Sequence, residues 1–194
     1  TQCSSNFREN INAKIISITG SCGKTTLKEM IGFTLQKISK TTFSPKSFNN
    51  KYGVPVSLFN LKQNDDFGVF EVGMDKKGEI NNLTKITKPN LGIITNISYA
   101  HSKNFKSINK IAEAKAEIMN HIRKDGAVVL NMDDSFYNYH KKIASKKKLK
   151  IISFGIKAKF PSTKLVKIKK IKNKYELFIN VNGLSVSFYS HNNN

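Results

Sequence analysis

The first residues that could do chemistry form a short glycine-containing loop between an apolar run, 15–18, and a helical pattern. The loop consists of Gly20, Ser21, Cys22, Gly23, Lys24, Thr25 and Thr26. Glycines allow backbone N–H groups to surround an oxyanion, and the N-terminus of the following helix adds partial positive charge. The Lys24 ammonium can reach the β- and γ-phosphates of a nucleotide, and the Thr25 hydroxyl can ligate Mg²⁺. The sequence therefore predicts a phosphate-binding loop, although Ile18 stands where the longer G-x-x-x-x-G-K-[ST] pattern has its first glycine.

Further polar side chains follow predicted strands, where a parallel sheet gathers its ligands. They are Glu71, Asn96, His101, Asn131 and Asp133. Glu71 stands where a Mg²⁺ beyond a phosphate loop would need a hard oxygen ligand. Taken singly, His101 is more often a loop histidine than a ligand, and Lys115 is by default a solvated helix lysine.

The elements that must position these residues alternate along the chain. Apolar runs predict strands at 13–19, 41–44, 67–73, 91–97, 127–130 and 150–154. Helical patterns fall between them at 25–38, 54–61, 78–86 and 108–122, with one more ending at about 144. Strands separated by helices predict an α/β fold, a mostly parallel sheet with helices on both faces.

The period changes from helical to two after about residue 164. Apolar residues alternate over 177–181 and again over 184–188, and Asn182-Gly183 between them is a strong hairpin signal. With a third strand at 166–171, this predicts a small C-terminal antiparallel β meander. We divide the chain into a polar lead-in at 1–12, an α/β core at 13–160, an antiparallel subregion of the same domain at 161–190, and a final 191–194.

Composition limits the class of protein. A chain of 194 residues with 39% hydrophobic residues can bury one α/β core. No apolar run approaches the ~20 residues that span a bilayer, and the first ten residues lack the apolar core of a signal peptide. Cys3 and Cys22 do not make a disulfide framework, which favours a reducing cytoplasm.

The net charge of +20 invites a nucleic-acid interpretation. However, Arg8 and Arg123 are the only arginines, whereas specific nucleic-acid readers favour arginine for its bidentate contacts. The lysines gather late, with no acidic residue from 135 to 175 and no interleaved stacking aromatics at 141–174. We therefore expect a solvated lysine-rich face and no nucleic acid as partner.

Taken together, the motifs have a recognisable order. The chain resembles the Mur ligases, ATP-dependent amide ligases of peptidoglycan synthesis, over about 14–154 and specifically in their central domain. The resemblance rests on the Gly20–Thr26 loop, on Glu71-Val-Gly73, and on His101 followed by Lys115. A stretch of the chain, Phe48-Asn49-Asn50-Lys-Tyr-Gly53-Val54-Pro55, resembles the member that adds a dipeptide. The expected fold is thus the phosphate-loop NTPase-like central domain of that family.

The resemblance implies roles for individual residues, with ATP and Mg²⁺ as cofactors. It implies that Gly20 to Thr26 cradle the phosphates, that Thr25 and Glu71 hold a first Mg²⁺, and that His101 and Lys115 serve a second. Lys24, Lys115 and His101 are the implied catalytic residues. The lysine matching Lys115 is carbamylated by CO₂ in the family, which supplies oxygens suited to Mg²⁺ and requires a lowered pKa. Asn131 and Asp133 match positions near the nucleotide.

The resemblance also implies substrates and partners. Asn49 and Asn50 match a loop that faces the muramoyl substrate, although Lys46-Ser47 replaces a Gly-Asn pair often seen before that loop. The implied substrates are UDP-N-acetylmuramoyl-tripeptide and D-alanyl-D-alanine, joined through an acyl phosphate. The expected partners are N- and C-terminal domains of the same enzyme, the second starting at 191–194. We expect a monomer without membrane insertion, inactive as a ligase by itself.

Alternatives remain open. Another Mur ligase or a folylpolyglutamate synthetase-like enzyme would share the loop, but the stretch from Asn49 to Pro55 argues against both. A kinase would also share the loop but gives no account of His101 and Lys115. A non-catalytic lysine-rich module that binds nucleotide or nucleic acid would be indifferent to loss of Glu71 or Lys115, and its nucleic-acid affinity would fall steeply with salt.

Overall fold

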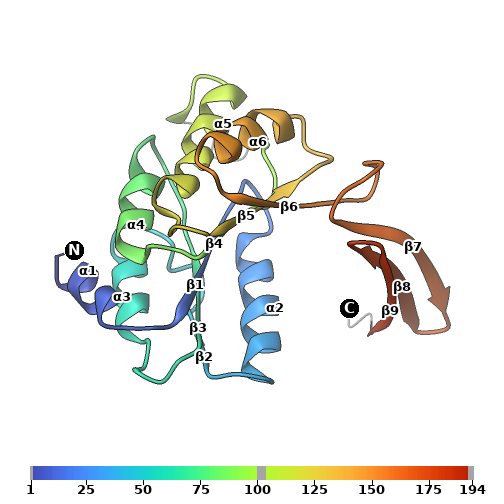
Figure 1. Ribbon diagram of the computed structural model, residues 1–194, viewed down its shortest axis with the longest axis horizontal. Coiled ribbons are helices and arrows are strands. Elements are labelled where there is room, and N and C mark those ends of the chain that lie inside the picture. Colours follow the sequence, from blue (N-terminus) through green and yellow to red (C-terminus); the bar gives the residue numbers. More distant parts are fainter. Residues whose placement is uncertain (1, 100–103, 192–194) are drawn as a thin grey trace.

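The computed structural model describes residues 2–99 and 104–191, which form one twisted sheet with helices on its two faces (Figure 1). In these residues the sheet has nine strands in the order β2-β3-β1-β4-β5-β6-β7-β8-β9. The strands are β1 (Lys14–Thr19), β2 (Thr41–Phe43), β3 (Phe67–Glu71), β4 (Leu91–Ile94), β5 (Ala127–Asn131), β6 (Lys150–Gly155), β7 (Thr163–Ile171), β8 (Lys174–Val181) and β9 (Leu184–His191). The strands from β2 to β6 pair in parallel, which confirms the predicted α/β class.

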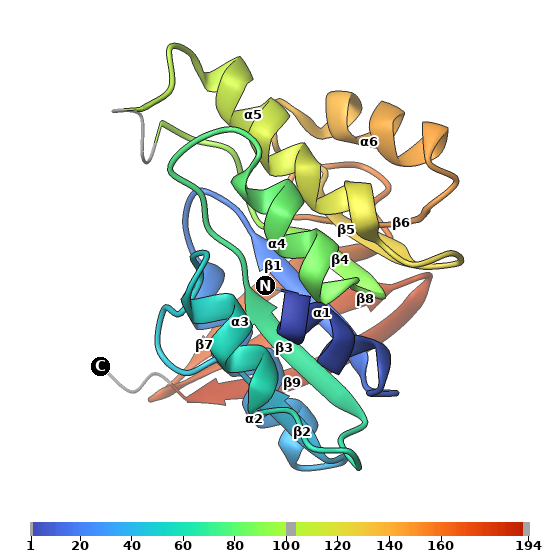
Figure 2. The same cartoon turned by 90° about the vertical axis from the view of Figure 1, so that its left-hand side faces the viewer.

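Helices cover both faces of the parallel part. They are α1 (Gln2–Glu9), α2 (Lys24–Gln36), α3 (Gly53–Phe59), α4 (Glu79–Thr87), α5 (Ile108–Ala116) with the 3₁₀ turn η2 (Glu117–His121), and α6 (Tyr137–Lys146). Helix α2 lies on one face, while α1, α3, α4 and α5 lie on the other, in front of the sheet in Figure 2. None of the helices in the described ranges is long and apolar enough to cross a membrane.

Alternating side chains of the central strand explain the two layers. Ile16 and Ile18 of β1 pack with Leu27 and Ile31 of α2. Ile15 of the same strand points to the other face, into a cluster with α3 and α4. Because successive side chains of a strand point to opposite faces, one apolar run can feed both layers. The β1 strand is therefore buried on both sides, which fixes the loop that follows it.

The C-terminal strands continue the same sheet. Strand β7 pairs in parallel with β6 only at Thr163 and Lys164, then turns antiparallel to β8, which pairs with β9. The predicted antiparallel meander and its Asn182-Gly183 turn are thus confirmed. Figure 1 shows this meander projecting from the helix-covered body beyond α2.

Several elements end a few residues away from their predicted bounds, and tertiary contacts explain two of these differences. The strand predicted at 91–97 ends at Ile94. The Thr95 N–H still donates to the Thr19 carbonyl of β1, but the Thr95 hydroxyl and the Asn96 carbonyl bond to the glycine loop. The helix predicted at 108–122 becomes 3₁₀ from Glu117, whose carboxylate accepts hydrogen bonds from the Gly78 and Asn81 N–H groups at the start of α4.

Helix α1 was not predicted, since its segment is polar. It is held by Arg8, which is 1% exposed and donates hydrogen bonds to the carbonyl oxygens of Thr87 (2.8 Å), Ile11 (2.6 Å) and Ala13 (3.2 Å). Phe7 of the same helix packs beside Phe59 of α3, with 5.2 Å between ring centroids. The helix thus closes the edge of the core beside β1.

Replacing Arg8 with Met should lower the free energy of unfolding by about 3 kcal/mol, because three carbonyl oxygens lose a charged donor in the interior. Urea denaturation of the variant and the native chain measures this difference. The exposed Lys14 supplies the matched control, since Lys14→Met removes a cation at the surface and should change stability by no more than about 0.5 kcal/mol. Equal stability of the two variants would contradict the anchoring role of Arg8.

Candidate functional site

The glycine loop joins the end of β1 to the start of α2, as predicted, and its two glycines are required there. Gly20 has a φ of 150°, and a Cβ at this position would lie 1.8 Å from the Thr95 Oγ1 atom. Gly23 has a φ of 79° and precedes α2 directly. Only glycine adopts both conformations without strain and allows this close approach. The loop therefore places the N-terminus of the thirteen-residue α2 at the carboxyl end of β1.

Residues after β4 hold the loop in shape. The Ser21 N–H donates to the Asn96 carbonyl (3.0 Å), and the Cys22 N–H donates to the Asn96 side-chain oxygen (3.1 Å). The Thr95 hydroxyl donates to the Cys22 carbonyl (2.7 Å), and the Ser98 N–H donates to the Ser21 hydroxyl (2.8 Å). Sequence reasoning placed Asn96 at a strand end but missed the parts of Thr95 and Ser98, because nothing in their local sequence marks a partner about 75 residues away.

Two lysines converge on one carbonyl oxygen of the loop. The Lys24 ammonium lies 3.1 Å from the Gly20 carbonyl oxygen, and the Lys115 ammonium, which comes from α5, lies 2.9 Å from it. Lys115 is only 2% exposed. Burial, and next the nearby charge of Lys24, lowers the pKa of Lys115 from 10.5 to about 7. The site therefore combines concentrated positive charge with an amine that loses its proton near neutral pH.

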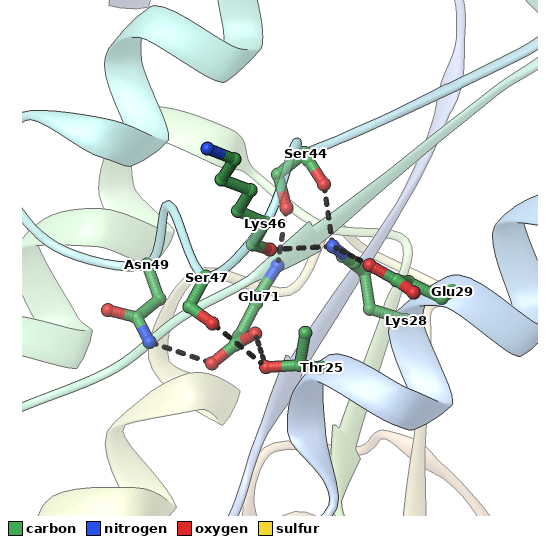
Figure 3. A network of polar contacts seen from close by, with 8 residues as sticks. All are labelled: Thr25, Lys28, Glu29, Ser44, Lys46, Ser47, Asn49 and Glu71. Atoms are coloured by element: carbon green, nitrogen blue, oxygen red, sulfur yellow. Dashed lines mark hydrogen bonds and ion pairs between the residues drawn. The ribbon is translucent and has the colours of Figure 1, made fainter.

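Glu71 is the centre of the polar network in Figure 3. It ends β3 and is 1% exposed. One carboxylate oxygen accepts from the Thr25 hydroxyl and the other from the Asn49 side-chain amide, each at 2.7 Å. The Ser47 hydroxyl lies 3.3 Å from the Thr25 hydroxyl. The family resemblance already paired Thr25 with Glu71, and the structure adds Asn49 to the same carboxylate.

The donor set around Glu71 suits Mg²⁺. A carboxylate and a hydroxyl are hard oxygen ligands, and Mg²⁺ commonly takes one or two carboxylates from the protein and the rest from water and phosphate. No cluster of three or more His, Cys, Asp or Glu residues that could hold a metal is found within 2–99 and 104–191. An ion between Thr25 and Glu71 would therefore take its other ligands from water and nucleotide phosphates.

A cavity of about 840 Å³ opens beside these residues. Its lining includes Lys24, Lys51, Lys76, Lys85, Lys115, Asp75, Glu79, Asn49, Asn50, Tyr52 and Met74. Five lysines face two carboxylates, so the cavity carries excess positive charge and fits an anionic ligand with some apolar surface. Both predicted substrate residues, Asn49 and Asn50, line it.

Other predicted site residues have structural partners. The Asp133 carboxylate accepts the N–H groups of Ile156 (2.6 Å), Lys157 (3.1 Å) and Ala158 (2.7 Å), and these bonds lower its pKa. Asn131 donates to the Thr95 carbonyl at 3.3 Å. Both residues lie on the same sheet edge as the loop. Their contact with a nucleotide stays a prediction.

The remaining predicted residues lie near the same edge or outside the described ranges. The Asn50 side-chain oxygen accepts from the Tyr52 and Gly53 N–H groups at the start of α3. Thr26 is exposed in the first turn of α2. His101 lies outside the described residues, so its predicted partnership with Lys115 stays a prediction.

A mostly parallel sheet with a glycine loop, a lysine and a threonine between its central strand and a helix places the chain among α/β domains with a phosphate-binding loop. Residues 18–191 match the profile of the Mur ligase middle domain. The chain belongs to the Mur ligase family, and it represents that middle domain.

Individual relatives agree with this assignment. The chain is 40% identical, over 152 residues, to the UDP-N-acetylmuramoyl-tripeptide–D-alanyl-D-alanine ligase of Buchnera aphidicola from Acyrthosiphon pisum, covering 78% of this chain and 33% of that protein. It is 38% identical over 176 residues to the protein of the same name from Rickettsia prowazekii, covering 90% of this chain and 39% of that protein. The chain thus spans about a third of the length of these relatives.

Solved structures show the same fold. A crystal structure of MurF from Acinetobacter baumannii superposes with a TM-score of 0.89 at 31% identity, covering 97% of this chain and 41% of that one. MurF from Thermotoga maritima, solved in complex with ADP, gives a TM-score of 0.84 at 22% identity, which bears on the fold alone. The predicted family resemblance is confirmed.

The lowered pKa of Lys115 should make stability depend on pH. Between about pH 7 and pH 10.5 the unfolded chain keeps this proton and the native chain releases it, so the free energy of unfolding rises with pH. Relative to a Lys115→Met variant, the native chain should gain about 2 kcal/mol between about pH 7 and pH 9. Urea denaturation across this range measures the gain.

The exposed Lys110 of the same helix provides the control for this measurement. Lys110→Met removes a lysine at the surface, so its stability should run parallel to that of the native chain with pH. A Lys115→Met curve that is also parallel to the native curve would contradict the lowered pKa.

Proposed function

We propose that this chain binds Mg²⁺·ATP at the glycine loop and forms the nucleotide-binding centre of an amide ligase. The observation that carries the proposal is the meeting of the loop and Lys24 with the Thr25–Glu71 pair beside a positively charged cavity. The relatives' names support D-alanyl-D-alanine and UDP-N-acetylmuramoyl-tripeptide as the substrates of the whole enzyme. Since the chain spans about a third of those relatives, we do not expect it to ligate by itself.

The chemistry would proceed in two balanced steps. A carboxylate oxygen of the muramoyl peptide attacks the γ-phosphorus of ATP, and ADP leaves. The amino group of D-alanyl-D-alanine then attacks the acyl carbon, releasing phosphate and a proton as the amide forms. Phosphoryl transfer depends chiefly on positioning and charge neutralisation. Here the loop N–H groups and Lys24 would hold the phosphates, while Asn49 and Asn50 would face the peptide substrate in the cavity.

Mg²⁺ would be held by Thr25 and Glu71, where it would neutralise charge on the β- and γ-phosphates. A second ion is proposed at Lys115 with His101. An ammonium cannot ligate a cation, so Lys115 would first react as the free amine with CO₂ to give a carbamate and a proton. Its pKa of about 7 supports this, because the free amine is then abundant near neutral pH.

Replacing Lys24 with Ala should abolish measurable binding of Mg²⁺·ATP, because the phosphates lose the ammonium that the loop itself supplies beside the Gly20 carbonyl. Isothermal titration calorimetry on the native chain and the variant, each with and without Mg²⁺, measures the effect. We expect the native chain to bind at millimolar concentration or tighter and to need Mg²⁺ for full affinity.

Two further variants complete this test. Lys37→Ala removes an exposed lysine just beyond the same helix and should bind like the native chain. Glu71→Gln should lose the gain in affinity that Mg²⁺ provides, since one ligand of the ion is weakened. Equal binding by the native chain and Lys24→Ala would refute the nucleotide site.

Carbamylation of Lys115 is tested separately. A chain incubated with ¹³C-bicarbonate at about pH 8 should show a carbamate carbon signal by NMR, because most of an amine with a pKa of about 7 is unprotonated there. The signal should be absent in Lys115→Met and retained in Lys110→Met. A spectrum without any carbamate signal from the native chain would count against the proposal.

A further inference from the structure

Lys28 is a fully buried lysine one turn beyond Thr25 on α2, and the functions assigned so far do not use it. Its ammonium donates hydrogen bonds to the carbonyl oxygens of Ser44 and Lys46, each at 2.7 Å. A third contact, of 3.3 Å, reaches the carboxylate of the half-exposed Glu29. Figure 3 shows the ammonium pointing from the helix into the turn that leads to Asn49.

Burying this ammonium is costly. A charged group in the interior must be hydrogen-bonded to offset the hydration that it loses. The two carbonyls and the Glu29 carboxylate use the three donors of the ammonium. All three donors of Lys28 are thus used inside the protein, and two of them fix carbonyl oxygens of one segment.

The segment that these carbonyls belong to forms one wall of the Glu71 site. Backbone bonds hold its two ends: the Ser44 N–H donates to the Val69 carbonyl (2.9 Å), and the Gly73 N–H donates to the Asn49 carbonyl (2.8 Å). Between the ends, Lys46 has a φ of 45°. This left-handed conformation is unfavourable for a residue other than glycine and needs support from its surroundings.

Lys28 supplies that support at the middle of the segment, because the Lys46 carbonyl is one of its two acceptors. The residues that follow are the ones that meet the site: Ser47 lies 3.3 Å from the Thr25 hydroxyl, and Asn49 donates to Glu71 at 2.7 Å. Helix α2 thus carries both the Thr25 hydroxyl and the ammonium that fixes the segment opposite it, from Ser44 to Asn49.

We propose that Lys28 is a positioning residue for the Mg²⁺ site. It holds the turn at Lys46 so that Ser47 and Asn49 orient the Thr25 hydroxyl and the Glu71 carboxylate for the ion. The inference rests on the proposed function, because it assigns Lys28 to the metal-dependent part of nucleotide binding. In this role Lys28 acts through the turn, because its three donors are used by Ser44, Lys46 and Glu29.

The test compares Lys28→Met with Lys37→Met, which removes an exposed ammonium just beyond the same helix. Calorimetry gives the affinity for ATP with and without Mg²⁺. In Lys28→Met the gain in affinity from Mg²⁺ should fall roughly tenfold, as is typical when a group that orients a metal ligand is removed. Affinity for ATP without Mg²⁺ should stay unchanged, and Lys37→Met should resemble the native chain in both.

Hydrogen exchange on the nucleotide-free chain is the second readout. The Phe48 N–H donates to the Pro45 carbonyl at 3.2 Å within the turn. In Lys28→Met this amide should exchange roughly tenfold faster, since loss of the support opens the turn locally. Amides of α4 and β5 should exchange at the native rate. Unchanged exchange at Phe48 would overturn the proposal, as would an equal loss of ATP affinity with and without Mg²⁺.

Whether the variant folds also tests the positioning role of Lys28. If Lys28→Met does not fold, Lys28→Gln, which keeps two donors for the two carbonyls, undergoes the same measurements. If neither variant folds, Lys28 serves the stability of the whole domain and the positioning role is refuted. Failure of the native chain to bind Mg²⁺·ATP would contradict the proposed function, whereas exchange at Phe48 would still show whether Lys28 holds the turn.

Discussion

Two ammonium groups, those of Lys24 and Lys115, converge on the Gly20 carbonyl oxygen at the end of the central strand. Burial lowers the pKa of Lys115, and repulsion by the nearby Lys24 charge lowers it further. An anion in the loop would relieve this repulsion. Gly20 itself packs directly against Thr95, where a side chain would collide. The rest of the site is arranged around this concentration of positive charge.

The carboxylate of the site comes from β3, the strand next to β1. Ile18 of β1 stands beside Glu71 of β3 in the parallel register, so the carboxylate reaches the sheet edge near the loop. There it meets the Thr25 hydroxyl instead of a lysine. Among the described residues, Lys24 and Lys115 thus form a cationic half of the site. Thr25 and Glu71 form a half rich in oxygen ligands. That separation suits a polyphosphate bridged by a metal ion.

Much of this arrangement could be predicted from the sequence because its signals are local. Each signal is formed by residues that are close in sequence: the glycine loop, the individual apolar runs and helical patterns, and the Asn182-Gly183 turn. The structure confirms all three. Helix α1 was missed because a polar segment gives no periodic signal, and its buried contacts through Arg8 reach as far as Thr87. The bonds of Asp133 to the turn at 156–158 were missed for the same reason of distance in sequence.

The sequence by itself determined the class of fold, the glycine loop between strand and helix, and the identity of the groups that could bind phosphate and metal. Only the tertiary structure decided which of those groups meet. It placed Asn49 on Glu71, Lys115 on the carbonyl of Gly20, and Lys28 under the turn at Lys46. The reason is physical: residue type and spacing fix local backbone shape, whereas burial and contacts across the sheet depend on how distant segments pack.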